Sequence, residues 1–325
     1  NTLETRLNDQ GETRRIAILL AYDALRHNQN GDAKRALTSC RAALNAARSL
    51  GDEPITISQL IRIACAITAC QAIERTLAQN EPPRDELTSL QRALEMEDAH
   101  PDLLIIMRGE RAMSHALFDA VENGDVSVNG LAGVRWNWLD SIFVWMGRMD
   151  TREDHVLMLS LMTRAIAQAQ LPMPQQLEAE RQLDQEIQKV RGLPRPPILT
   201  GLLMPPMTKR GEASRRNHAS LRCMTVALAA ERYRQKHKTW PETLDKLCPQ
   251  FLEAVPRDPF DGEPLRYHRV EDGVVIYSVS SDGADNNGNL DSAHPNQPGV
   301  DIGYRLWDVA KRRQPPRPKL PPNPE

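Results

Sequence analysis

A helical period runs through much of the chain and limits what it can fold into. Between about residue 12 and residue 192, apolar side chains recur three or four positions apart, as they do along one face of an α-helix. Gly31-Asp32 and Gly51-Asp52 mark the ends of two such segments. Further helices are predicted over residues 57–79, 85–98, 101–123, 156–169 and 174–192. The pattern predicts an all-helical domain over 12–192, built from antiparallel hairpins or an irregular α-solenoid.

Two proline-rich stretches divide the rest of the chain. Proline fixes φ and removes a backbone donor, so residues 193–211 are predicted to form a linker or an extended stretch packed across the surface. The tail over 311–325 combines prolines with charged and polar residues and is predicted to be disordered. A second domain is predicted between them, over 212–310.

The overall composition argues against some classes of protein. The 325 residues carry a net charge of −2 with both signs well mixed, whereas nucleic-acid-binding proteins usually show a basic stripe. The longest unbroken apolar runs, 16–22 and 103–107, are much shorter than the ~20 residues needed to cross a bilayer. Because the sequence begins with Asn1, we expect any membrane anchor or secretion signal to lie upstream of it.

The cysteines give no sign of a metal site. There are five, and they form no Cys-x-x-Cys and no Cys/His ligand set, so zinc is not expected. A disulfide between Cys223 and Cys248 is a minor alternative, because geometry rather than sequence decides it.

The second domain has a different pattern from the first. A long helix is predicted over 213–238 and a short one ending at Leu247. Alternating apolar and polar residues predict strands over 265–269 and 274–279, and a last strand is predicted over 303–307. The expected fold of this part is therefore α+β: a long helix followed by a three-stranded antiparallel sheet.

Carboxylates crowd the loop between the last two predicted strands. This loop contains Asp282, Asp285, Asp291 and Asp301, together with Gly283 and Gly288, which permit the positive φ that turns carbonyl groups inward. Ca²⁺ takes six to eight oxygen ligands from carboxylates and backbone carbonyls. The loop is therefore a candidate calcium site, and the alternative is a solvated acidic turn.

Several short motifs of this domain, taken in order, resemble the globular domain of the major pseudopilin of type II secretion systems. They are Trp240-Pro241, the turn Asp258-Pro259-Phe260 with Gly262, Pro264 and Tyr267, the pair Tyr277-Ser278, and then Asp282-Gly283 and Asp301-Ile302. The resemblance implies one Ca²⁺ held by the carboxylates of Asp282 and Asp301 and by the carbonyl of Val279. It leaves Asp285 and Asp291 as competing candidates for a middle ligand. The long apolar stem of pseudopilins is missing here, which puts polymerisation in doubt.

No catalytic constellation is found in the sequence. The eight histidines are scattered without ligand spacing, and no nucleophile elbow or phosphate-binding glycine loop occurs. Glu110, which lies between Arg108 and Arg111, is expected to join an ion-pair network between helices. The cluster of Trp136, Trp138, Phe143 and Trp145 is interpreted as a core helix, with a partner-binding or membrane-surface patch as the alternative.

These features together predict a non-enzymatic, extracytoplasmic protein, secreted or held to a membrane by a segment upstream of this chain. Its helical domain would bind protein partners, and its second domain would be stabilised by Ca²⁺, with a link to type II secretion or envelope assembly. No nucleic-acid partner is expected. The alternative is a cytosolic helical-repeat adaptor without a metal.

Overall fold

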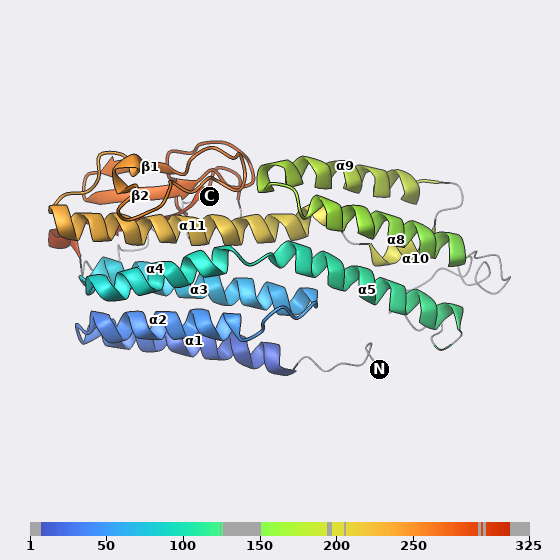
Figure 1. The fold of residues 1–325 in the computed structure, drawn as a ribbon, viewed down its shortest axis with the longest axis horizontal. Helices are drawn as coiled ribbons and strands as arrows, with labels where there is room; N and C mark the ends of the chain where they lie inside the picture. Colours follow the sequence, from blue (N-terminus) through green and yellow to red (C-terminus); the bar gives the residue numbers. More distant parts are fainter. Residues whose placement is uncertain are drawn as a thin grey trace, which may run out of the picture.

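The computed structural model describes residues 8–123, 125, 151–193, 197–204, 206–291, 294 and 297–312. It is mostly helical, with one small antiparallel sheet near the C-terminus (Figure 1). The helices are α1 (Asn8–Gln29), α2 (Ala33–Arg48), α3 (Thr56–Gln79), α4 (Arg84–Asp98), α5 (Asp102–Glu122), α8 (Thr151–Gln168), α9 (Met173–Arg191), α10 (Ile198–Leu203) and α11 (Met207–His237). The strands are β1 (Arg266–Val270), β2 (Gly273–Ser278) and β3 (Ile302–Trp307), and the 3₁₀ turns are η2 (Leu244–Leu247) and η3 (Val309–Lys311).

The long helix α11 lies against both the N-terminal helices and the sheet, and its N-terminal end reaches the group formed by α5, α8, α9 and α10 (Figure 1). Its C-terminal part is sandwiched between α3 and α4 on one side and the sheet on the other, while its N-terminal part packs against α5 and α9. Helices α1 and α2 cover the far side of α3 (Figure 1). The predicted α+β class is therefore present, and its helix is shared with the helices that precede it in the chain.

The sheet is a meander in the order β1-β2-β3, antiparallel throughout, as the alternation of residues predicts. Every residue of β2, the central strand, is buried. Gly273 opens β2 with φ 157°, and a Cβ there would lie 1.9 Å from the carbonyl oxygen of Leu306 on β3. Glycine therefore allows β2 and β3 to pair closely at that end.

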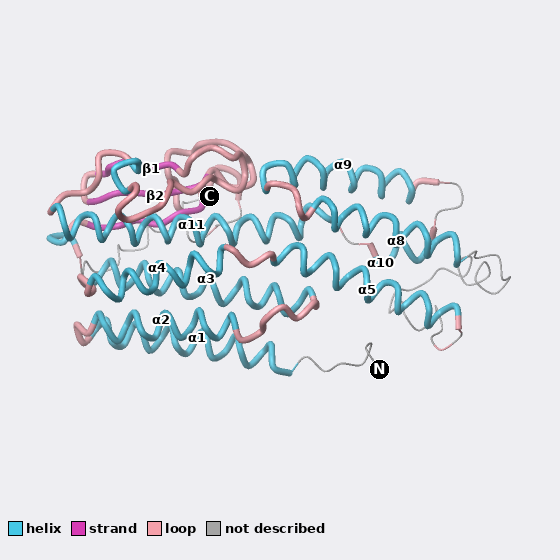
Figure 2. The backbone as a smooth tube through the Cα atoms, viewed as in Figure 1, coloured by secondary structure: helices cyan, strands magenta, loops and turns pink. Residues whose placement is uncertain are grey.

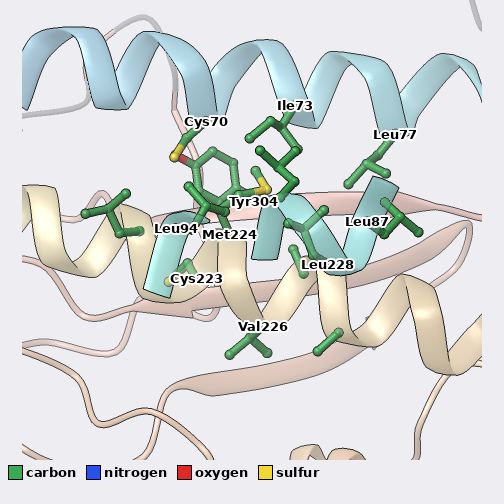
Figure 3. Packing of buried hydrophobic residues seen from close by; sticks show 14 of the residues in the cluster. Cys70, Ile73, Leu77, Leu87, Leu94, Cys223, Met224, Val226, Leu228 and Tyr304 are labelled. Carbon is green, nitrogen blue, oxygen red and sulfur yellow. The ribbon is translucent and has the colours of Figure 1, made fainter. Parts of the chain in front are cut away.

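A single buried apolar cluster joins α1–α4, α11 and the sheet. Figure 3 shows its centre, where Ile73 of α3, Leu94 of α4 and Met224 of α11 lie around Tyr304 of β3, while Leu77 lies farther along α3 beside Leu87 of α4. Tyr304 is 5% exposed and shares a hydrogen bond of 2.5 Å with the hydroxyl of Ser220 on α11. Truncation of one of these leucines to alanine typically costs about 2–5 kcal/mol of stability. The sheet and the N-terminal helices thus depend on the same core.

A second buried cluster lies among α5, α8, α9, α10 and the start of α11, and it includes Phe118, Met158, Leu161 and Leu183. Between α9 and α11 the structure differs from the linker or extended stretch predicted over 193–211. Residues Ile198–Leu203 form α10, and α11 begins at Met207 rather than near residue 213.

Distant carboxylates explain both of these helix starts. Asp154 of α8 accepts hydrogen bonds from the backbone amides of Leu199 and Thr200, at 2.8 and 3.0 Å. Asp184 of α9 does the same for the amides of Met207 and Thr208, at 2.7 and 3.1 Å. The first amides of a helix have no partner within the helix, so these carboxylates act as caps. Both carboxylates lie more than 20 residues earlier in the chain, so the sequence around the prolines does not predict these helix starts.

Helix α3 is the one described helix that could cross a membrane by length and composition, but 56% of its apolar window is buried inside the fold. Polar residues interrupt its apolar runs, so the length of unbroken apolar runs in the sequence does not single it out. Its buried residues belong to the core shared with α1, α2 and α11.

Two predictions fall outside the described residues. They are the interpretation of Trp136, Trp138, Phe143 and Trp145 as a core helix, and the prediction of disorder for the tail over 311–325 from residue 313 onward. The first two residues of that tail contradict the prediction, because Lys311 ends η3 and the buried Arg312 donates a hydrogen bond of 2.8 Å to Glu231 of α11.

Candidate cation-binding loop

The acidic loop leaves the end of β2 and returns to the start of β3, and it lies among the coil segments beside the sheet (Figure 2). Its first residues are held by Asp258, whose carboxylate is fully buried. Asp258 Oδ2 accepts a hydrogen bond from the amide of Val279 at 2.9 Å, and its Oδ1 accepts one from the hydroxyl of Ser278 at 2.8 Å. The Asp258-Pro259-Phe260 turn thus positions the beginning of the acidic loop.

Val279, the predicted carbonyl ligand, lies directly after β2. Its side chain is 1% exposed and packs in a small cluster with Ala219 of α11 and Phe260. The next residue, Ser280, accepts a hydrogen bond of 3.0 Å from Arg216 of α11. The backbone at this end of the loop is therefore fixed to the helix and to the Asp258 turn.

Gly283 and Gly288 adopt the positive φ expected from the sequence, 68° and 70°. At Gly288 a Cβ would meet Val275, His268 and Tyr277 at 2.9–3.2 Å. Glycine is therefore required there by space as well as by conformation.

The structure brings Asp282 and Asp301 together. The side-chain amide nitrogen of Asn286 lies 3.4 Å from Asp282 Oδ2 and 3.5 Å from Asp301 Oδ1. Backbone amides complete the arrangement, since Gly299 donates to Asp282 at 2.7 Å and Gly288 donates to Asp301 at 2.9 Å. The carboxylates of Asp282 and Asp301 thus both contact the side-chain amide of Asn286 at the point where the loop closes.

The competing candidates, Asp285 and Asp291, lie in different surroundings. Asp285 accepts hydrogen bonds from the hydroxyl of Tyr277 and from the amide of Asn287, both at 2.9 Å. Asp291 pairs with His294 Nδ1 at 3.0 Å. Of the two, Asp285 lies close enough to Asp301 for its charge to act on that carboxyl.

The electrostatics differ between the two central carboxylates. Burial raises the pKa of Asp301, opposed by the Gly288 and Asn286 amides, and the charge of Asp285 adds to the increase. The hydrogen bond from the Gly299 amide lowers the pKa of Asp282. A cation placed between them would favour the ionised form of both groups.

The described part of the chain contains one group in which three histidine or carboxylate ligand atoms converge, and it lies outside this loop. It consists of His115, Asp119 and His155, between α5 and α8. No ligand spacing among the histidines is visible in the sequence, because these two are 40 residues apart in the chain. His115 and Asp119 stand four positions apart on one helix, which was the only local signal.

Two other predictions concern chemistry away from the loop. Glu110 pairs with Arg210 of α11 at 3.0 Å, which confirms the ion pair between helices. The cysteines are all free, so the alternative of a Cys223–Cys248 disulfide is not realised. Cys223 instead donates to the carbonyl of Ile302 at 3.5 Å.

No family model matches the chain, and neither a curated protein nor a solved structure matches it.

Proposed function

We propose that this is a non-enzymatic protein whose C-terminal part is a pseudopilin-like module locked by Ca²⁺. The observation that carries the proposal is the meeting of Asp282 and Asp301 at the amide of Asn286. Two carboxylates at a loop closure repel each other when ionised, and a divalent cation between them removes that repulsion. If its side-chain amide turned over, Asn286 would present an oxygen to the same point.

The module would serve as a structural element in an extracytoplasmic protein. Calcium modules of the extracellular kind have dissociation constants of about 10⁻⁴–10⁻³ M, so they are occupied outside the cell and empty in the cytosol. Binding to the folded state alone stabilises it by RT ln(1 + [L]/Kd), about 1.4 kcal/mol at a tenfold excess of calcium over Kd. We propose a location in the periplasm or cell envelope, with a membrane attachment upstream of Asn1, and a role in type II secretion or envelope assembly.

The proposed protein partners would bind the helical part of the chain. Ile16, Leu19 and Tyr22 of α1 are 49%, 66% and 65% exposed, and they share the outer side of that helix. A shallow groove between α1 and α3 lies beside them, lined by Ile18, Tyr22 and Leu25. Exposed apolar groups gathered in this way are typical of interaction surfaces.

A second candidate function is a cytosolic helical adaptor whose acidic loop holds no metal. Two observations favour it. Each loop carboxylate already has a partner within the loop, such as the Gly299 amide for Asp282. All five cysteines are free, as is usual in a reducing compartment.

Thermal unfolding of the whole chain distinguishes these functions. The whole chain is needed because the module shares its core with α3 and α4. With several millimolar Ca²⁺ we expect the midpoint to rise by about 2–4 °C over the value with chelator, and to rise less with Mg²⁺.

Matched variants locate the effect. Asp282→Asn and Asp301→Asn should each abolish the calcium response, while Asp245→Asn, at an exposed carboxylate of the same module, should retain it. Equal midpoints with calcium and chelator would reject the calcium lock and favour the adaptor. A normal calcium response in both loop variants would show that the ligand assignment is wrong.

A further inference from the structure

Two histidines on neighbouring helices point their ring nitrogens at each other. His115 of α5 and His155 of α8 lie side by side, with 2.9 Å between His115 Nδ1 and His155 Nε2. Asp119, one turn after His115, lies 3.6 Å from the other ring nitrogen of His115. One ligand atom from each of the three residues lies within 4.8 Å of the others.

The His155 ring is held in place by two further contacts. Its Nδ1 lies 3.1 Å from Glu122 Oε1, so the Nδ1–H can donate to this carboxylate and leave a lone pair on Nε2. Phe118 stacks on the ring with 4.7 Å between centroids and 9° between planes. A carboxylate behind a histidine is the usual outer support of a metal-bound imidazole, because it sets the tautomer and the ring orientation.

The pair of facing nitrogens can hold only one proton between them. A metal ion that replaces this proton would bind both nitrogens at about 2.0–2.1 Å, with the nitrogens about 3.3 Å apart in a tetrahedral site. The observed separation therefore has to grow by only about 0.4 Å. The side chains of His115 and Asp119 are 51% and 50% exposed, so they are free to make this adjustment and the ion can enter from solvent.

We propose that His115, Asp119 and His155 form a binding site for a divalent transition metal of the Zn²⁺ class, with Glu122 supporting His155. Two imidazoles and one carboxylate suit zinc, cobalt or nickel, whereas Ca²⁺ and Mg²⁺ prefer oxygen ligands only. The three protein ligands leave a fourth position for water or another donor. This site is independent of the calcium loop and of the function proposed for it.

The metal would cross-link α5 to α8. These helices are adjacent in space and are separated by residues 123–150 in the chain. The second apolar cluster, which includes Phe118, Met158 and Leu161, lies directly beneath the site. A metal bound here would stabilise that cluster through binding to the folded state only.

The test is a titration of the chelator-treated whole chain with Co²⁺, followed by competition with Zn²⁺. We expect one equivalent of Co²⁺ with visible absorption typical of nitrogen and oxygen ligands. Zn²⁺ should displace it, a millimolar excess of Ca²⁺ or Mg²⁺ should not, and Zn²⁺ should raise the thermal midpoint.

Variants assign the ligands. His115→Ala changes a half-exposed side chain and should leave the helices folded, as circular dichroism would check, while it weakens Zn²⁺ binding by about 100-fold or more. Asp119→Asn, at a similarly exposed side chain, provides a second ligand variant. Glu122→Gln removes only the support of His155 and should weaken binding by about 10–100-fold.

His27→Ala is the matched control. His27 Nε2 lies 3.4 Å from Asp23, four positions earlier on α1, but the guanidinium of Arg26 lies 3.1 Å from the same nitrogen and would repel a cation there. This variant should bind Zn²⁺ like the unmodified chain.

Three results would overturn the proposal. They are no cobalt uptake by the unmodified chain, unchanged zinc affinity in both His115→Ala and Asp119→Asn, or an intense thiolate-to-cobalt absorption band that disappears in Cys248→Ser. The last result would place the ion at a cysteine instead.

Discussion

His218 Nδ1 lies 2.7 Å from Asp98 Oδ1, and through this contact α11 is joined to the end of α4. The other ring nitrogen of His218 lies 3.4 Å from Asp102 Oδ1, at the start of α5. Ser214, one turn earlier on α11, donates a hydrogen bond of 2.5 Å to the same Asp102 oxygen. A buried histidine between two carboxylates therefore holds three helices together at the junction of the two apolar clusters.

The charge on His218 predicts a loss of stability at alkaline pH. Burial by itself would lower the pKa of His218, but the hydrogen bonds to Asp102 and Asp98 outweigh it and raise the pKa to about 9. The ordinary value is 6.5, so this stabilisation is complete below pH 6.5 and is lost as the pH rises through about 9. Denaturant unfolding between pH 6 and 10 should show this decline. His218→Gln should flatten it, and His237→Gln, at an exposed position of the same helix, should not.

We expect the protein to become more stable when the carboxylate of Glu74 on α3 is removed. Burial raises the pKa of Glu74 to about 7, against the effect of a hydrogen bond from the Arg305 amide. The folded state therefore loses stability as the pH rises from 4.5 through 7. Glu74→Gln keeps an oxygen for the Arg305 amide and should add about 1–3 kcal/mol to the free energy of unfolding at pH 8. The gain should disappear at pH 4, and an equal gain at both values would contradict this explanation.

We expect a strong requirement for glycine at position 109, inside α5. A Cβ at this position would lie 1.7 Å from the carbonyl oxygen of Pro54, in the turn before α3. Gly109→Ala should therefore force α5 away from this turn and cost about 1–3 kcal/mol or more, measured by chemical denaturation. Gly11 of α1 has nothing within 4 Å of its Cβ position and is the control. Gly11→Ala should stabilise the protein by about 0.5–1 kcal/mol, since alanine favours the helix.

We expect a large loss of stability when the carboxylate of Asp258, which holds the start of the acidic loop, is removed. Its buried carboxylate accepts hydrogen bonds from the amides of Phe260 and Val279, from Ser278 and from Arg266. Asp258→Ala leaves several buried donors without a partner and should cost about 3 kcal/mol. Asp261→Ala removes the other carboxylate that pairs with Arg266, at a more exposed site, and should cost about 1 kcal/mol. Similar losses in the two variants would count against a special role for Asp258.

Local patterns in the sequence predict the elements of this protein well. The helix over 57–79 is predicted within one residue, because its apolar spacing and flanking turns are local signals. The meander is predicted for a similar reason, since short strand-forming runs are separated by turn residues, although the central strand β2 is buried throughout and does not alternate.

The differences arise where a partner comes from far along the chain. Asp154 and Asp184 cap the starts of α10 and α11, in a segment whose prolines alone predict a linker. The same limit applies to the candidate sites. Asp282 and Asp301 could be chosen from the loop sequence, whereas the meeting of His115 with His155 depends on how α5 packs against α8.

Helix α11 has 31 residues and is about 46 Å long. It contributes Met207 to one apolar cluster and Leu221, Met224 and Leu228 to the other. Insertion or removal of one residue between them would turn one half of the protein against the other by about 100°. The length and rotational phase of α11 thus set the distance and the relative rotation of the two apolar clusters. We therefore expect this helix to accept substitutions far more readily than any change in its number of residues.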